Sequence, residues 1–344
     1  MRDDQWDAML RLVRGESIMP EPVGLIIDCP WLPGWFGTTI LEYLSDDETW
    51  LAANLKVMRE FPGMWFLPGF WAEYGMSTEP SAFGVRCRFH ENDFPHAERV
   101  LPSWQEADRI TVPDCRTDGL LPFVIKRLQH CRGRIEAAGH RIRFAVSRGP
   151  MNIASYLLGQ TEFLLGLRSE PERALQLLDK VSRFIVDWLR YQKECFPSIE
   201  GVLVLDDLIG FVGPRDFERF ACPFLRLVFA ALDVPVKMLH NDAHGLITAK
   251  YAAQIGFNAF NFSYEHGLGE IRALAGEEVV LVGNIPPRDV LAGGTPEDVA
   301  RAVQAAKASL TDRRRVLWSA GGGTPPGVTS ENLRAFYEAV TACA

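Results

Sequence analysis

The stretch Gly201-Val-Leu-Val-Leu-Asp-Asp207 contains the pattern that decides the fold of this chain. Five consecutive apolar residues followed by charged ones are typical of a short strand that is buried on both faces. A helix-compatible segment follows at 215–232, with a kink expected at Pro223. The next apolar run, Val234-Pro-Val-Lys-Met-Leu239, again ends in a polar residue, His240. Strands that alternate with helices predict βαβ units and a parallel sheet.

The same rhythm recurs along the chain. Further strands are expected at 23–27, 142–146, 256–262, 279–282 and 316–318. A total of roughly seven or eight strand–helix units favours a closed (β/α)8 barrel, the TIM-barrel class of α/β folds. An open doubly wound sheet is the alternative, and the absence of a Gly-x-Gly-x-x-Gly motif after the first strand weakens it. The segment from about 60 to 118 is irregular and rich in proline and aromatic residues. We expect it to form a lid or wall over the mouth of a single-domain barrel.

The composition is that of a globular protein, since the 344 residues carry a net charge of −8 and 47% of them are hydrophobic. The acidic excess argues against binding to nucleic acid or to an anionic membrane surface. The seven cysteines lie far apart and form no Cys-x-x-Cys motif, as expected for reduced thiols. The N-terminal segment does not resemble a signal peptide, and no apolar run is long enough to span a bilayer. We therefore expect a soluble, cytoplasmic protein.

The segment His240-Asn-Asp-Ala-His244 carries the sharpest chemical signal. Active sites of TIM barrels lie at the carboxyl ends of the strands, and this segment directly follows a predicted strand. Imidazole and carboxylate groups together suit zinc or another divalent cation, so His240, Asp242 and His244 are candidate metal ligands. The alternative is that these side chains only form hydrogen bonds with loop backbone or with substrate.

Two adjacent carboxylates, Asp206 and Asp207, end the strand at 201–205. Side chains alternate along a strand, so one carboxylate should face the barrel mouth and the other should be held by a neighbouring element. The mouth-facing carboxylate could act as a general base or bind a cationic group, and helix capping is the alternative for the pair. Arg148, at another strand end and before a helix, could hold an anionic group of the substrate.

Further candidates for the site come from the irregular segment and from other strand ends. Glu73, beside Trp71 and Tyr74, indicates a pocket in which aromatic rings surround a carboxylate, and we assign it a catalytic role. The remaining candidates, which we assign to substrate binding together with Trp71 and Tyr74, are Asp28, Asn284, Ser319 and Gly322. Each of them could instead serve only the chemistry of a tight turn.

Four motifs occur in an order that resembles the uroporphyrinogen-decarboxylase-like superfamily. Ser147-Arg-Gly-Pro-Met-Asn-Ile-Ala-Ser-Tyr-Leu157 resembles GxPFTLASYL, and Leu205-Asp-Asp-Leu-Ile-Gly-Phe-Val-Gly-Pro-Arg-Asp-Phe217 resembles FDSWAGxLSPxDF. Val282-Gly-Asn-Ile-Pro-Pro-Arg-Asp-Val-Leu291 resembles GNLDPxxL, and Gly323-Thr-Pro-Pro-Gly-Val-Thr-Ser-Glu-Asn332 resembles GIPPxTPxEN. The resemblance covers more than half of the chain. It implies a (β/α)8 barrel and an enzyme that is either a decarboxylase or a methyltransferase linked to cobalamin.

Two departures from the family motifs bear on the choice of branch: the first counts against the decarboxylases, and the second alters the metal site of the methyltransferases. The decarboxylases carry an arginine-rich segment after the first strand, whereas Ile27-Asp-Cys-Pro-Trp-Leu-Pro-Gly-Trp-Phe36 contains no arginine. The methyltransferases hold zinc with a His-x-Cys pair and a later cysteine in a glycine-rich loop. Here the pair is His240 and Asp242, and the loop Ala320-Gly-Gly-Gly323 has no cysteine. The resemblance therefore implies a metal site rebuilt with nitrogen and oxygen ligands, or lost.

These comparisons lead to three functional hypotheses. The first is transfer of a methyl group from a small methylated substrate to a folate, or to a corrinoid carried by a partner protein. The second is a decarboxylase or lyase that acts on a non-porphyrin carboxylic acid and uses Arg148 and Asp206. The third is a non-catalytic ligand-binding barrel. Homodimers are common in the family, so the resemblance also implies a possible dimer.

Overall fold

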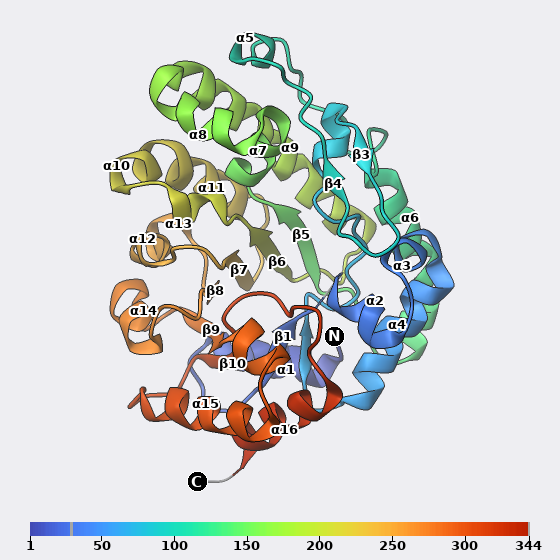
Figure 1. Ribbon diagram of the computed structural model, residues 1–344, viewed down its shortest axis with the longest axis vertical. Helices are drawn as coiled ribbons and strands as arrows, with labels where there is room; N and C mark the ends of the chain where they lie inside the picture. The colour runs from blue at the N-terminus through green and yellow to red at the C-terminus, as the bar shows by residue number, and fades with distance from the viewer. Residues whose placement is uncertain (28–29, 343–344) are drawn as a thin grey trace.

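The computed structural model describes residues 1–27 and 30–342. Within these ranges a ring of parallel strands forms a (β/α)8 barrel with helices around it (Figure 1). The barrel strands are β1 (Gly24–Ile26), β2 (Trp65–Leu67), β5 (Phe144–Arg148), β6 (Gly201–Leu205), β7 (Val236–Asn241), β8 (Ala259–Phe262), β9 (Val280–Ile285) and β10 (Val316–Ala320). β5 to β10 form one sheet in sequential order, and β1 pairs with β2. A parallel bridge between Val23 and Trp318 joins β10 to β1.

On the edge of β5 that faces β2, side chains rather than a neighbouring strand form hydrogen bonds with the backbone N–H and C=O groups. The side-chain amide of Gln192 accepts a hydrogen bond from Val146 N at 3.0 Å and donates one to Val146 O at 2.9 Å. Glu79 Oε1 accepts a hydrogen bond from Arg148 N at 3.1 Å. Buried backbone groups need partners, and Gln192 and Glu79 supply those that a paired strand would provide. This junction of the barrel is therefore closed by side chains that come from outside the sheet.

Helices of widely different length surround the strands. Before β5 they are α1 (Asp3–Val13), α2 (Trp31–Phe36), α3 (Ile40–Ser45), α4 (Asp47–Glu60), α5 (Trp104–Ala107) and α6 (Leu121–Ala137). Between β5 and β7 they are α7 (Pro150–Leu158), α8 (Gln160–Ser169), α9 (Pro171–Cys195), α10 (Pro214–Asp216) and α11 (Cys222–Phe229). The last are α12 (Leu246–Lys250), α13 (Ala252–Ile255), α14 (Leu268–Ala275), α15 (Pro296–Ala308) and α16 (Ser330–Thr341). Short 3-10 or π turns lie at Pro80–Phe83, Leu208–Phe211, Phe217–Ala221 and Pro287–Ala292.

Two apolar clusters build the core. The larger one fills the layer between the strands and the surrounding helices. The smaller one lies inside the barrel and includes inward-facing residues such as Leu203, Met238 and Leu317. Helix α1 adds Trp6 to this inner cluster, and its ring meets Phe144, the first residue of β5, edge to face at 5.5 Å. Because α1 packs at the amino ends of the strands, the barrel is closed there, and the opposite end is left for a site.

Most of the strand predictions are confirmed, and one segment needs a correction. The strands expected at 142–146, 201–205, 234–239 and 316–318 all form, within a few residues of the predicted bounds. The expected kink at Pro223 is confirmed, because the π-helical turn Phe217–Ala221 separates α10 from α11. The segment 60–118, however, contains the barrel strand β2 as well as irregular chain and the small β3–β4 pair (Cys87–Arg88 and His96–Ala97). With three residues, β2 is too short to show a periodic pattern in the sequence.

Among the described helices, none combines the length and the apolar character that crossing a membrane would require.

Candidate functional site

A cavity of about 410 Å3 opens at the carboxyl ends of the barrel strands. Arg148, Asp207, His240 and Asp242 are among the polar side chains that line it, and Trp71 contributes an aromatic wall. Several of the residues expected at strand ends therefore line one cavity. The volume falls in the range of pockets that hold small organic ligands.

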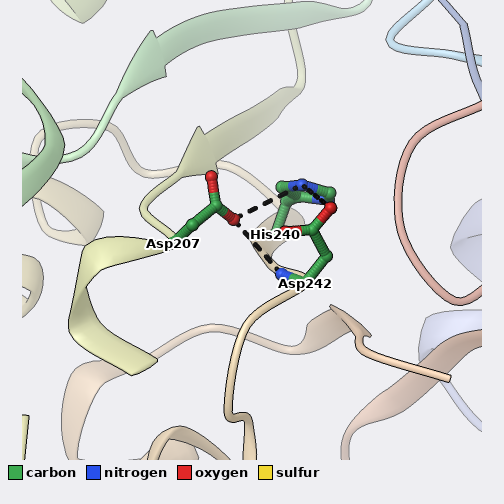
Figure 2. Close-up of side chains that lie close together, drawn as sticks. All are labelled: Asp207, His240 and Asp242. Carbon is green, nitrogen blue, oxygen red and sulfur yellow. Dashed lines mark hydrogen bonds and ion pairs between the residues drawn. The ribbon is translucent and has the colours of Figure 1, made fainter. Parts of the chain in front are cut away.

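Asp207, His240 and Asp242 form a compact group within this cavity. Each offers one potential ligand atom, and the three atoms lie within 4.8 Å of one another. His240 Nε2 lies 3.6 Å from Asp207 Oδ1 and 3.9 Å from Asp242 Oδ2. Figure 2 shows the carboxylate of Asp207 pointing toward the imidazole of His240. One imidazole nitrogen and two carboxylate oxygens make a donor set that suits zinc and related divalent cations.

Asn261 on β8 holds the imidazole of His240 in this orientation. Its Oδ1 lies 2.6 Å from His240 Nδ1, while its Nδ2 donates hydrogen bonds to Val282 O and Ala320 O. Since Nδ2 is the donor in both of those bonds, Oδ1 is the acceptor, and the proton of the neutral imidazole resides on Nδ1. The lone pair of His240 Nε2 is therefore free to face the two carboxylates.

Asp207 is anchored from two sides while its side chain remains one-third exposed. Its Oδ1 accepts a hydrogen bond from Asp242 N at 3.2 Å, so the carboxylate fixes the turn that follows β7. Asn152 Nδ2 lies 3.5 Å from its other oxygen. Desolvation raises the pKa of Asp207 above its ordinary value, with His240 opposing the shift and Asp242 adding to it. A bound cation would lower the pKa again, because it stabilises the ionised carboxylate.

Asp206 has a different place from the one expected for a catalytic residue. The expectation that the two adjacent carboxylates point in different directions is met, and Asp206 is the fully buried one. Its two oxygens accept hydrogen bonds from Met151 N and Asn152 N, both at 3.0 Å, at the start of α7. Burial raises the pKa of Asp206 well above its ordinary value, and these two N–H donors oppose the shift. Asp206 caps α7 and is not among the residues that line the cavity.

His244 also lies apart from the group in which it was predicted. Its Nδ1 is 3.3 Å from Nε2 of His266, and the two rings are stacked with their centroids 5.3 Å apart. Gly245 N donates to the same His266 nitrogen. The turn after β7 does not fold back toward His240, so Asp207 rather than His244 completes the group of three.

Arg148 reaches the cavity with its charge already compensated. Its guanidinium forms ion pairs with Glu73 at 2.8 Å and with Glu79 at 3.2 Å, and all three side chains are buried. The ring of Trp71 lies 6.0 Å from the guanidinium carbon. Glu73, which we expected to act as a catalytic carboxylate in an aromatic pocket, instead holds Arg148 and does not line the cavity.

The other predicted substrate-binding residues that the structure describes do not line the cavity. Tyr74 packs against Phe89, and Asn284 Nδ2 donates to His266 O. Ser319 is fully buried, and its hydroxyl has no partner among the described residues. Gly322, with a φ of +133°, passes close to Asp242. Asp28 lies outside the described residues.

Several residues that line the cavity were not among the candidates chosen from the sequence. Asn152 lies within the first turn of α7, Met76 and Phe94 come from the irregular segment, and Arg288 follows β9. Asn152 and Arg288 do lie inside two of the family-like motifs, so a signal existed for them. Met76 and Phe94 have no such signal, because their role depends on how the segment 68–118 folds over the barrel.

Comparison with known proteins agrees with this architecture. The family model described as uroporphyrinogen decarboxylase (URO-D) matches residues 32–343. The chain belongs to the uroporphyrinogen decarboxylase family. Among its relatives, the uroporphyrinogen decarboxylase of Psychromonas ingrahamii is 26% identical over 76% of this chain and 75% of its own. That of Dichelobacter nodosus is 23% identical over 97% of this chain and 96% of its own.

Solved structures with the same fold include a methyltransferase. The methyltransferase from Methanosarcina mazei matches with a TM-score of 0.81 and 18% identity, covering 96% of both chains. A B12-independent methionine synthase from a Shewanella species has a TM-score of 0.55 and 10% identity, covering 95% of this chain and 96% of its own. At such identities the likeness shows the fold. Family membership indicates an enzyme.

Proposed function

We propose that this protein is a metal-dependent methyltransferase that moves a methyl group from a small methylated substrate to a corrinoid or folate acceptor. The observation that carries the proposal is the group formed by Asp207, His240 and Asp242, whose ligand atoms lie within 4.8 Å of one another. A methyltransferase of the same fold, from Methanosarcina mazei, adds support.

The donor atoms of the group fit a divalent cation. His240 would bind through Nε2, because its Nδ1 is engaged by Asn261, and each carboxylate would supply one oxygen. The nitrogen and oxygen donors suit zinc, and no thiolate takes part. Such a cation supplies Lewis acidity, which lowers the pKa of a bound thiol or water. The residues themselves hold and orient the reacting group, and the cavity of about 410 Å3 limits the substrate to a small molecule.

The runner-up is a decarboxylase or lyase, which the names of the curated relatives favour. Two contacts count against its original assignment to Arg148 and Asp206. Arg148 is paired with Glu73 and Glu79, so its charge is not free for a substrate carboxylate. Both carboxylate oxygens of Asp206 accept hydrogen bonds from the amino end of α7, so they are not free to bind a substrate. A non-catalytic ligand-binding barrel is the third candidate, and the desolvated carboxylate of Asp207 beside a histidine favours an enzyme over it.

The proposal is tested by metal analysis of the purified protein together with a methyl-transfer assay. We expect one divalent metal per chain in the wild type and in His244→Ala, and little metal in His240→Ala and Asp207→Asn. Methylated thiols, amines and alcohols are then supplied with cob(I)alamin kept reduced by a chemical reductant or with tetrahydrofolate, and the methylated acceptor is measured.

Methyl transfer that follows the metal content across these variants supports the proposal. Absence of methyl transfer to every acceptor from the metal-loaded wild type contradicts it. Release of carbon dioxide from a small carboxylic acid under the same conditions would favour the lyase instead.

A further inference from the structure

Two arginines line the cavity, and their electrostatic states differ. Arg148 is 4% exposed and is neutralised by two buried carboxylates, Glu73 and Glu79. Arg288 is exposed and is also a lining residue. Among the described residues, no carboxylate oxygen lies within ion-pair distance, 4.0 Å, of its guanidinium. Arg288 therefore supplies the free positive charge of the described cavity lining.

The backbone around Arg288 is held in place by the fold. Arg288 lies in the π-helical turn Pro287–Ala292, directly after β9, and two prolines precede it. Its carbonyl oxygen accepts a hydrogen bond from Gly293 N at 2.8 Å, and Pro286 O accepts one from Leu291 N at 3.1 Å. The restricted backbone of the prolines and these hydrogen bonds limit the region that the side chain can sample.

The charges around the cavity select the kind of anion that would fit. Asp207 and Asp242 line the same cavity as Arg288, yet neither reaches its guanidinium within the ion-pair distance. A ligand can therefore lie between the two carboxylates and the arginine. A single guanidinium carries one positive charge and a planar fork of N–H donors, which matches a singly charged carboxylate in geometry and charge.

We infer that the small molecule bound in this cavity carries a carboxylate, and that Arg288 receives it while the reacting group lies at Asp207, His240 and Asp242. The inference rests on the proposed placement of the reaction in this cavity, and it does not depend on which methyl acceptor is used. Arg288 is then a specificity-determining residue.

Binding of a matched pair of probes tests this role without requiring turnover. Isothermal titration calorimetry compares methylthioacetate with methylthioacetamide, which has the same number of heavy atoms and no charge. We expect the wild type to bind the carboxylate roughly tenfold more tightly than the amide, as a charge-assisted hydrogen bond provides. Arg288→Gln should bind both equally, and Arg288→Lys should keep part of the preference.

Arg215→Gln serves as the matched control, because Arg215 is exposed, lies outside the cavity lining and likewise forms no ion pair with the described residues. It should keep the full preference for the carboxylate. A wild type without the preference, or an Arg288→Gln variant that retains it, overturns the inference. A preference that depends on Arg288 in a protein that transfers no methyl group would contradict the proposed function alone.

Discussion

His240 owes its orientation to a single side chain on the neighbouring strand. Asn261 Oδ1 accepts a hydrogen bond from His240 Nδ1, and Asn261 Nδ2 is itself fixed by donating to Val282 O and Ala320 O. Hydrogen-bond partners of this kind orient a histidine and raise its affinity for a metal. Asn261 is therefore a positioning residue that acts through His240.

We predict that Asn261→Leu lowers the zinc affinity about 10- to 100-fold, because the imidazole loses its fixed orientation. Asn261→Asp retains an acceptor for the hydrogen bond from His240 Nδ1, so its zinc affinity should fall by less. The affinity is measured by competition with a chromogenic chelator. Asn284→Leu is the control, since Asn284 bonds to His266 O rather than to His240. Equal losses in the Asn261 and Asn284 variants would show that the effect is one of general destabilisation.

Among the elements, α7 depends on a carboxylate from the adjacent strand end. Asp206 Oδ1 and Oδ2 accept hydrogen bonds from the amides of Asn152 and Met151, which the first turn of a helix leaves without intrahelical partners. Gly149 is required beside it, because a Cβ at that position would lie 2.3 Å from Asp206 Oδ2.

We predict that Asp206→Ala lowers the free energy of unfolding by about 2 kcal/mol or more, because two buried amides lose their acceptor. Metal binding by the folded protein should remain, since Asp206 is not a ligand. Urea unfolding measures the first effect and metal analysis the second. Thr295→Ala, which removes the exposed cap of α15, should cost only about 1 kcal/mol. Loss of metal from folded Asp206→Ala would contradict the assignment of separate roles to Asp206 and Asp207.

The glycine-rich loop after β10 is a second element that bears on the site. Gly322 has a φ of +133°, and a Cβ there would lie 3.2 Å from Asp242 Oδ2. The neighbouring Gly323 has no atom within 4 Å of the corresponding Cβ position.

We predict that Gly322→Ala weakens metal binding several-fold, because the strained loop and the new methyl group displace Asp242. Gly323→Ala should leave the affinity within about twofold of the wild type, since a factor of two is only ~0.4 kcal/mol. The chelator competition described for Asn261 measures both. Indistinguishable affinities in the two variants would mean that Asp242 is not held by this loop.

At the scale of the whole molecule, stability should depend on pH through a buried histidine. Four histidines, His140 among them, lie in polar sequence contexts that predict surface positions, and for His140 this is wrong. Its side chain packs edge to face against Phe70 at 5.6 Å, and Nδ1 has no partner among the described residues. Burial lowers the pKa of His140 from 6.5 to about 4, and the positive charges of the Met1 amino group and Arg2 add to the shift.

Between about pH 6.5 and about pH 4 the unfolded chain therefore binds a proton at this position that the folded chain does not. The free energy of unfolding should fall as the pH is lowered through this range, by up to about 3 kcal/mol from His140. His140→Phe should flatten this part of the curve in urea unfolding. His130→Phe is the control, because His130 is exposed and should leave the slope unchanged. An equal slope of the free energy of unfolding against pH in the wild type and in His140→Phe would show that His140 does not cause this pH dependence.

Local patterns in the sequence were sufficient to predict the barrel class and to place the candidate residues at the ends of predicted strands. Apolar runs such as Gly201–Leu205 mark buried strands, and parallel βαβ units bring the polar residues that follow them to one face. The motifs from Ser147 to Asn332 also indicated the family, and the match over residues 32–343 confirms it. Strand β2 was not predicted, because a run of three residues between irregular segments is too short to show the alternating pattern of a strand.

Tertiary structure alone decided which side chains act together. The sequence required Asp206 and Asp207 to diverge, because strand side chains alternate, but only the position of α7 shows that Asp206 is the capping residue. Likewise, His244 stacks on His266 and so does not join the group formed by Asp207, His240 and Asp242. The ion pairs of Arg148 leave Arg288 as the free cation of the described cavity lining. Periodicity is a property of neighbouring residues, whereas hydrogen bonds and ion pairs join residues that are far apart in the chain.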